Sequence, residues 1–73
     1  MTENKRLQKQ RLHVGLSQLA LANRSDVSRY RLVLFEAGGG RLTPDELARI
    51  ASVIRAEARR LRDRLAHLEA IGA

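Results

Sequence analysis

The feature that most constrains this 73-residue chain is a long C-terminal segment that lacks helix-breaking residues. It begins at Thr43-Pro44-Asp45-Glu46, a capping box in which the threonine caps a helix, the proline takes the first position and the glutamate reaches back. After this proline, neither glycine nor proline occurs until position 72. At 1.5 Å per residue, the segment predicts one helix of about 42 Å or two helices with a bend near Ile54–Glu57.

Three shorter helices are predicted upstream, over residues 4–13, 18–23 and 29–36, where segments of helical period are divided by turn signals. Ser17 and Ser28 are the expected N-caps of the second and third helices. No window shows the alternation of a strand. The expected fold is therefore all-α, with five helices, or with four helices of which the last is long.

Apolar residues at helical spacing supply the predicted core. They are Leu7 and Leu12 in the first helix, Leu16, Leu19, Leu21 and Ala22 around the second, and Val27, Leu32 and Phe35 around the third. A chain of this size buries only about 60% of its unfolded surface, so such a core is usually stabilised by a disulfide, a metal ion or a partner chain. The absence of cysteine excludes disulfides and thiolate metal sites, and the two histidines lack a carboxylate cluster, so no metal or cofactor is expected.

The charge is strongly basic, with a formal net charge of +6 at pH 7. Residues 1–41 hold eight Lys and Arg against three acids, whereas residues 42–73 hold six against five, so the first half carries most of the field. No apolar run is long enough to span a membrane and no signal segment is evident. We therefore expect a soluble cytoplasmic protein with an anionic partner, nucleic acid before others. The alternative for the charge is a set of solvated helix faces.

A set of small and apolar residues between positions 15 and 38 has the spacing that a helix-turn-helix needs. Ala22 is small enough to let two helices cross closely, and a short turn follows it. Apolar residues at Leu21, Val27, Leu32 and Phe35 fix the crossing angle. The second of the two helices then presents its N-terminal turn outward.

On these residues the chain resembles the phage-repressor/Cro-type (XRE-like) helix-turn-helix domains. The resemblance extends without gaps from about residue 7 to 54 and includes Leu47, Ile50, Ala51 and Ile54. It implies a four- or five-helix domain whose third helix enters the DNA major groove.

Two departures from the family pattern lie in the same region. Asp26 stands where the family usually has glycine, at a position expected to need positive φ, which Asp tolerates better than most residues. Val33 and Leu34 occupy positions of the third helix that are often polar in the family.

The resemblance implies DNA contacts at the starts of the second and third helices. Gln18 and Ser28 match cap residues that contact phosphate, Arg29 and Tyr30 fall where base edges are read, and Leu34 is placed to pack on a thymine methyl. The alternatives are an exposed helix start for Gln18, a solvated Arg29, an intramolecular contact for Tyr30, and burial of Leu34 against a helix or a partner.

Further basic residues add to the implied contacts. Arg41 matches a loop contact to phosphate, and Arg24 and Arg31 add charge at the groove edge; solvated charge is the alternative for all three. Arg11 and Glu36 match a pair that joins the first helix to the end of the third, which we interpret as structural.

The C-terminal segment carries an unbroken heptad seam, formed by Leu47, Ala51, Ile54, Ala58, Leu61, Leu65 and Leu68. The resemblance assigns the part up to Ile54 to the domain core. We expect a helix-turn-helix domain over residues 1–54 and a dimerisation helix over 55–73, with a homodimer seam formed by Ile54, Ala58, Leu61, Leu65 and Leu68.

A parallel pair of these helices would place Glu57 near the partner's Arg62 and Arg64 near the partner's Glu69, both attractive. The alternative is that the segment folds back onto its own domain.

The predicted function is a sequence-specific DNA-binding transcriptional regulator without catalysis. A homodimeric repressor or autorepressor, which acts by occluding a promoter, would read an inverted-repeat operator with two recognition helices about 34 Å apart. Activation through RNA polymerase remains open, and the resemblance suggests a mobile-element setting. The alternative is a protein-binding module, such as an antiactivator or antitoxin that meets a second regulator, motivated by Val33, Leu34 and the leucine seam. No constellation of catalytic residues is present, and Gly38–Gly40 lacks the strand and the Lys-Ser/Thr of a phosphate loop.

Overall fold

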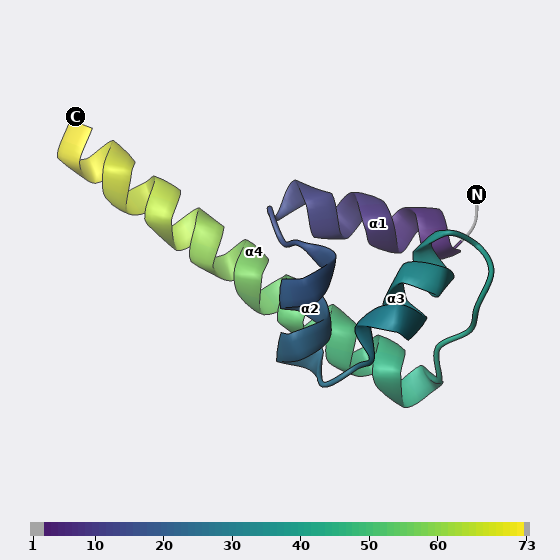
Figure 1. Ribbon diagram of the computed structural model, residues 1–73. Helices are drawn as coiled ribbons and strands as arrows, with labels where there is room; N and C mark the ends of the chain where they lie inside the picture. Colours follow the sequence, from purple (N-terminus) through teal and green to yellow (C-terminus); the bar gives the residue numbers. More distant parts are fainter. Residues whose placement is uncertain (1–2, 73) are drawn as a thin grey trace.

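The computed structural model describes residues 3–72, and over this range the chain forms four helices and no strand (Figure 1). They are α1 (Glu3–His13), α2 (Gln18–Ser25), α3 (Arg29–Glu36) and α4 (Pro44–Gly72). The predicted all-α fold with a long last helix is confirmed, and α4 is one continuous helix without the alternative bend. The predicted domain over residues 1–54 and the predicted dimerisation helix over 55–73 each extend beyond the described residues, by residues 1–2 and by residue 73.

The first three helices end in the same backbone arrangement. Gly15, Asp26 and Gly38 follow them with φ of 75°, 56° and 90°. In each case the next N–H donates to the carbonyl five residues earlier, at 3.1, 3.0 and 2.9 Å, which is the Schellman motif. The positive φ expected at Asp26 is therefore confirmed, and α2 reaches Ser25, two residues beyond its predicted end. Three tight ends allow three short helices to pack within a small volume.

The core lies where α2, α3 and α4 meet. Leu21, Leu32 and Ile50, one from each helix, have no more than 1% of their surface exposed. Other predicted core residues are also buried; they are Leu7, Leu16, Ala22, Val27 and Phe35. Arg11 and Glu36 are buried among them.

Two predicted core residues are not buried, and this prediction is wrong for both. Leu12 is 60% exposed and Leu19 is 49% exposed. Leu12 lies five residues after Leu7, about 140° around the helix, and Leu19 lies two residues before Leu21, about 200° around. The helical phase therefore turns both away from the buried face.

The last helix extends well beyond the domain. In Figure 1, α4 crosses behind α2 and its C-terminal half projects away from the other three helices. The molecule is accordingly elongated, 47 × 25 × 18 Å. Ile54 is buried, Ala58 and Leu61 are partly buried against the core, and Leu65 and Leu68 are exposed. None of the helices within residues 3–72 is both long enough and apolar enough to cross a membrane.

Candidate nucleic-acid interface

The turn between α2 and α3 is closed by backbone hydrogen bonds. Asp26 adopts φ 56° and ψ 47°, its N–H donates to the carbonyl of Asn23 at 3.3 Å, and the N–H of Val27 donates to Ala22 at 3.0 Å. Val27 is buried and anchors the turn to the core. The direction of α3 is thus fixed immediately before its first residue.

A side chain from α4 binds the same turn from outside. Arg49 donates from Nε to the carbonyl of Ser25 at 2.9 Å and from Nη2 to the carbonyl of Asp26 at 3.1 Å. It also forms an ion pair with Asp45, one helical turn earlier. Arg49 therefore acts as a positioning residue for the turn. The sequence did not reveal this role, because the partners lie 23 and 24 positions away and no local motif marks them.

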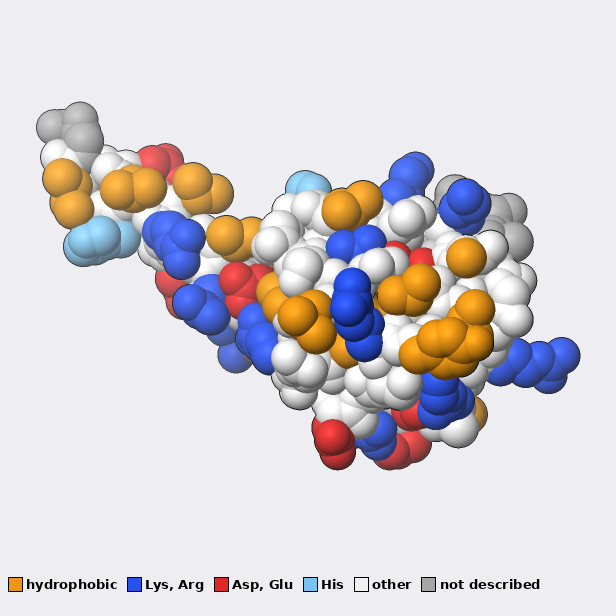
Figure 2. All heavy atoms as spheres, viewed as in Figure 1, with side chains coloured by type: hydrophobic (Ala, Val, Ile, Leu, Met, Phe, Trp, Pro, Cys, Tyr) orange, Lys and Arg blue, Asp and Glu red, His pale blue; other side chains and the backbone are white. Residues whose placement is uncertain are grey.

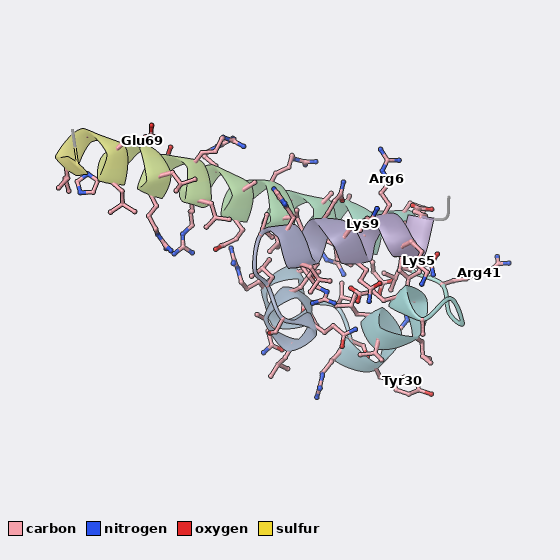
Figure 3. All side chains as sticks on the ribbon, turned by 90° about the horizontal axis from the view of Figure 1, so that it is seen from above. Lys5, Arg6, Lys9, Tyr30, Arg41 and Glu69 are labelled. Atoms are coloured by element: carbon pink, nitrogen blue, oxygen red, sulfur yellow. The ribbon has the colours of Figure 1, made fainter. Side chains whose placement is uncertain are left out.

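The first turn of α3 faces solvent. The Oγ of Ser28 accepts a hydrogen bond from the N–H of Arg31 at 3.4 Å, which confirms the predicted N-cap. Ser28, Arg29 and Tyr30 are exposed, whereas Leu32 is fully buried. Figure 3 shows the Tyr30 side chain extending outward from α3. The helix N-terminus, with its N–H groups and positive dipole end, is therefore presented together with an arginine and a tyrosine.

Two of the arginines in the predicted interface form ion pairs with carboxylates of α4. Arg24 Nη1 lies 2.8 Å from Glu57 Oε1, and Arg31 pairs with Glu46 while its Nη2 donates to the carbonyl of Arg41 at 3.1 Å. A hydrogen bond from Arg24 lowers the pKa of Glu57, and a hydrogen bond from the backbone of Thr43, assisted by Arg31, lowers that of Glu46.

The ion pairs reduce the positive field of the first half of the chain. The side chains of Arg24 and Arg31 stay 38% and 42% exposed, so both remain at the surface while paired. The carboxylates that pair with them, Glu57 and Glu46, lie within residues 42–73, so a charge count over residues 1–41 does not include them. The net field at the helix-turn-helix is consequently weaker than that count implies.

The predicted phosphate contact at the start of α2 has an intramolecular partner. Gln18 Nε2 donates to Glu36 Oε1 at 3.0 Å, and the side chain is half-buried. Ser17 caps α2, as predicted, by accepting from the N–H of Ala20 at 3.0 Å. Glu36 also binds Arg11, which is the predicted structural pair. The contact of Gln18 with phosphate stays a prediction.

The loop after α3 partly covers the far end of the recognition helix. Val33 and Leu34 are half-buried, and a Cβ added to Gly40 would lie 3.1 Å from the Cβ of Leu34. Arg41 follows in the loop and extends into solvent (Figure 3). Of the predicted DNA-contacting residues, five are exposed, and one of these, Arg24, is paired with Glu57. The other four are Ser28, Arg29, Tyr30 and Arg41.

The predicted dimer seam is divided by the fold. Ile54 is 8% exposed and belongs to the domain core, whereas Leu65 and Leu68 are 59% and 56% exposed. Glu57, expected to meet the partner's Arg62, is already bound to Arg24 and lies 3.3 Å from Arg60 within the same chain. The dimer contacts themselves stay a prediction.

Comparison with known families agrees with this geometry. A family described as helix-turn-helix matches residues 7–61, which include all of α2 and α3 and more than half of the chain. Searches of curated proteins and of solved structures returned no match. With its outward recognition helix and this match, the chain belongs to the XRE-like helix-turn-helix family of DNA-binding regulatory domains.

Proposed function

We propose that this protein is a sequence-specific transcriptional repressor that binds DNA as a homodimer and reads an inverted-repeat operator. The observation that carries the proposal is the accessible first turn of α3, with Arg29 and Tyr30 exposed beside a fully buried Leu32. A helix fixed on its inner face can enter the major groove without losing its own packing.

The proposed roles follow from the placement of each side chain. Arg29 forms a bidentate contact with guanine O6 and N7, and Tyr30 reads the neighbouring base edge. Ser28 and the N-terminus of α3 bind one phosphate, and Arg41 binds another. Leu34, where it emerges from under the loop, packs on a thymine methyl.

The remaining proposed contacts involve side chains that also have intramolecular partners. Arg24 and Arg31 contribute charge at the groove edge while bound to Glu57 and Glu46. Gln18 lies at the start of α2, where the helix dipole favours phosphate. Because these three side chains are tethered, they lose less conformational entropy on binding DNA than free side chains would.

Repression follows from occupancy of DNA. A dimer formed through α4 presents two recognition helices about one turn of DNA apart. While the dimer occupies the operator, RNA polymerase cannot bind there. The simplest regulated promoter is the protein's own, because its concentration then controls its synthesis.

The test is selection of bound DNA from a random pool, followed by titration of the selected operator with Arg29→Ala. We expect an inverted repeat, and we expect Arg29→Ala to weaken operator binding by about 1–3 kcal/mol while relaxing the preference at one base pair. Arg59→Ala is the matched control, since it removes an exposed charge of the same kind from α4. Equal operator affinity without Arg29 would rule out direct readout by this helix.

A protein-binding module on the same fold is the second candidate, favoured by the exposed apolar residues of α4. The salt dependence of the binding affinity distinguishes the two functions. Operator binding through several phosphate contacts should weaken by orders of magnitude between about 50 and 200 mM salt, whereas binding to an apolar protein surface should change little. The second candidate would be favoured if the selection recovered no preferred DNA sequence and the protein bound a protein partner with an affinity that does not depend on salt.

A further inference from the structure

Arg31 joins α3 both to the loop that follows it and to α4. Its guanidinium forms an ion pair with Glu46, at the start of α4, and its Nη2 donates to the main-chain carbonyl of Arg41 at 3.1 Å. A guanidinium group suits such a contact, because its N–H donors are held in a fixed planar fork. One side chain of the recognition helix therefore contacts two later segments of the chain.

The carboxylate of Glu46 uses both of its oxygens in this arrangement. Oε1 accepts from the N–H of Thr43 at 2.8 Å, which closes the capping box of α4, and Oε2 accepts from Arg31. Glu46 is only 8% exposed. Around the start of α4, Figure 2 shows acidic and basic side chains next to one another at the surface. Arg31 is thus attached to a carboxylate that is itself fixed at a helix start.

The loop between α3 and α4 runs back along α3. The N–H of Gly39 donates to the carbonyl of Leu34 at 2.9 Å, and a Cβ added to Gly40 would lie 3.1 Å from the Cβ of Leu34. Arg41 then comes level with Arg31, one helical turn before Leu34. In Figure 1 the loop leaves the end of α3 and descends to the start of α4. This path carries Arg41 toward the exposed first turn of α3.

The peptide group that Arg31 holds affects where the Arg41 side chain points. This group joins Arg41 to Leu42, which is 9% exposed and belongs to the core. Because a peptide group is planar, burial of Leu42 and the hydrogen bond to the Arg41 carbonyl together restrict its rotation. The directions open to the Arg41 side chain, which extends into solvent in Figure 3, are restricted with it.

We propose that Arg31 is a positioning residue for DNA binding, which holds the loop so that the Arg41 side chain is directed at a phosphate. The inference rests on the proposed phosphate contact of Arg41 and names the residue that prepares this contact. A loop already held in its binding conformation loses less conformational entropy when DNA binds, so the contact contributes more affinity. The charge that Arg31 brings to the groove edge is a separate effect, which lysine would retain.

Direct contact between Arg31 and a phosphate is the competing role. The Arg31 side chain is 42% exposed, so exposure does not separate the two roles. They differ in their dependence on Arg41. A direct contact acts whether or not the Arg41 side chain is present, whereas a positioning residue has little effect once that side chain is removed. The energetic coupling between the two arginines is therefore the quantity to measure.

The first test is a double-mutant cycle of Arg31→Lys and Arg41→Ala, with binding to a random-sequence DNA duplex measured over a range of salt concentrations. Lysine keeps the charge but lacks the fork that reaches Glu46 and the Arg41 carbonyl together. We expect Arg31→Lys to make the slope of log K against log salt shallower, by up to about 1, although the net charge is unchanged. In the Arg41→Ala background, the same substitution should change the affinity by less than about twofold.

The outcomes of this cycle separate failure of the inference from failure of the proposed function. If Arg31→Lys has the same effect with and without the Arg41 side chain, Arg31 does not act through Arg41 and the inference is overturned alone. If Arg41→Ala leaves the affinity unchanged, the proposed phosphate contact is overturned together with the inference. Arg59→Lys, at an exposed site of α4, is the matched control and should leave the affinity and the slope unchanged.

Nuclear magnetic resonance of the free protein tests the positioning without DNA. The backbone ¹⁵N order parameters of Gly40 and Arg41 report the mobility of the loop on the picosecond to nanosecond timescale. We expect Arg31→Lys to lower them from about 0.85, the value of rigid backbone, toward about 0.6, while the helices keep their values. Arg59→Lys should leave them unchanged. Order parameters that stay the same in Arg31→Lys would overturn the inference.

A second variant separates positioning from charge by the sign of its effect. Glu46→Gln removes the counter-charge of Arg31, while the glutamine oxygen still accepts the Thr43 N–H in the capping box. The variant gains one positive charge, which by itself favours DNA. We nevertheless expect it to bind DNA about threefold more weakly or worse, because the phosphate contact of Arg41 is no longer prepared.

Glu69→Gln is the control for this variant, because it makes the same charge change at an exposed site near the end of α4 (Figure 3). It should leave DNA binding unchanged or slightly stronger. Stronger DNA binding by Glu46→Gln than by the unmodified protein would contradict the proposed positioning role.

Discussion

The guanidinium of Arg11 faces the carboxylate of Glu36 through two hydrogen bonds, Nε to Oε2 at 2.7 Å and Nη2 to Oε1 at 2.8 Å. The side chains are 7% and 2% exposed, so the pair is buried. Arg11 also donates to the carbonyl of Leu16 at 2.9 Å, and Gln18 donates to Glu36. This pair joins the end of α1 to the end of α3 and fixes the side of the domain opposite the recognition turn.

Glu36→Gln should therefore destabilise the protein severely. The substitution leaves the Arg11 charge buried without its counter-charge, for which we expect a loss of about 3–5 kcal/mol in the free energy of unfolding. That loss approaches the whole stability of a domain of this size, so thermal unfolding followed by circular dichroism is the suitable measurement. Glu3→Gln, at an exposed acid in α1, is the control and should change stability by less than about 0.5 kcal/mol. A loss below about 1 kcal/mol for Glu36→Gln would contradict this account of the pair.

Asp26→Gly should stabilise the protein. Asp26 has φ 56° and ψ 47°, a conformation that costs an L-residue free energy and costs glycine almost none. The backbone bonds of the turn, including the one from Arg49 to the Asp26 carbonyl, do not depend on the side chain. We expect a gain of about 0.5–1 kcal/mol in urea unfolding. Asp63→Gly makes the same chemical change within α4, where glycine is about 0.3 kcal/mol less favourable than aspartate, so the two variants must move in opposite directions.

Stability should fall as the pH is lowered through the acidic range, with Glu46 as one cause. The backbone N–H of Thr43 donates to this carboxylate at 2.8 Å, and together with Arg31 it holds the pKa of Glu46 below the ordinary value of 4.5. A carboxylate with a lowered pKa in the folded state stabilises that state above its unfolded pKa, and the contribution is lost as the pH falls through the folded pKa. Glu57 contributes with the same sign through Arg24.

Glu46→Gln isolates the contribution of that charge. Glutamine still accepts the capping-box hydrogen bond, so the helix start is retained while the ionisation is removed. We expect the melting temperature of the variant to fall less steeply than that of the unmodified protein between pH values of about 6 and 3. Parallel curves for the two proteins would show that Glu46 does not contribute to the acid sensitivity.

Arg41→Ala should weaken binding to all DNA sequences about equally. The side chain leaves the loop after α3 and extends into solvent, where it suits a phosphate rather than a base edge. We expect the slope of log K against log salt to become shallower by about 1, without a change in the preferred operator. The comparison variant is Arg59→Ala in α4, whose slope should match that of the unmodified protein. A shift in base preference would instead place Arg41 in a groove.

The helix ends were largely predictable because their determinants are local. Ser17, Ser28 and Thr43 cap helices through hydrogen bonds to residues three positions away, and all three caps were predicted. The positive φ at Asp26 followed from its place in the helix-turn-helix pattern. The prediction of burial is wrong for Leu12 and Leu19, because apolar character alone does not give the phase of a residue around its helix.

The state of the interface arginines was not predictable in the same way. Arg24 meets Glu57 across 33 positions and Arg31 meets Glu46 across 15, so neither pair leaves a signal in the local sequence. The hydrogen bond from Arg49 to the Ser25 carbonyl, at the turn between α2 and α3, also joins residues that are far apart in the sequence. Such contacts depend on where α4 passes behind α2 and α3.

The sequence by itself determined where α2, α3 and α4 begin and which residues cap them, because each cap depends on residues within about one helical turn of one another. The helix-turn-helix spacing extends over residues 15–38 and was predictable as a pattern of small and apolar residues. Only the tertiary structure decided which charges are paired, which part of the leucine seam is buried and where α4 leaves the domain. These outcomes depend on the crossing of helices distant in sequence. A carboxylate such as Glu57 approaches an arginine such as Arg24 only after the core between their helices has packed.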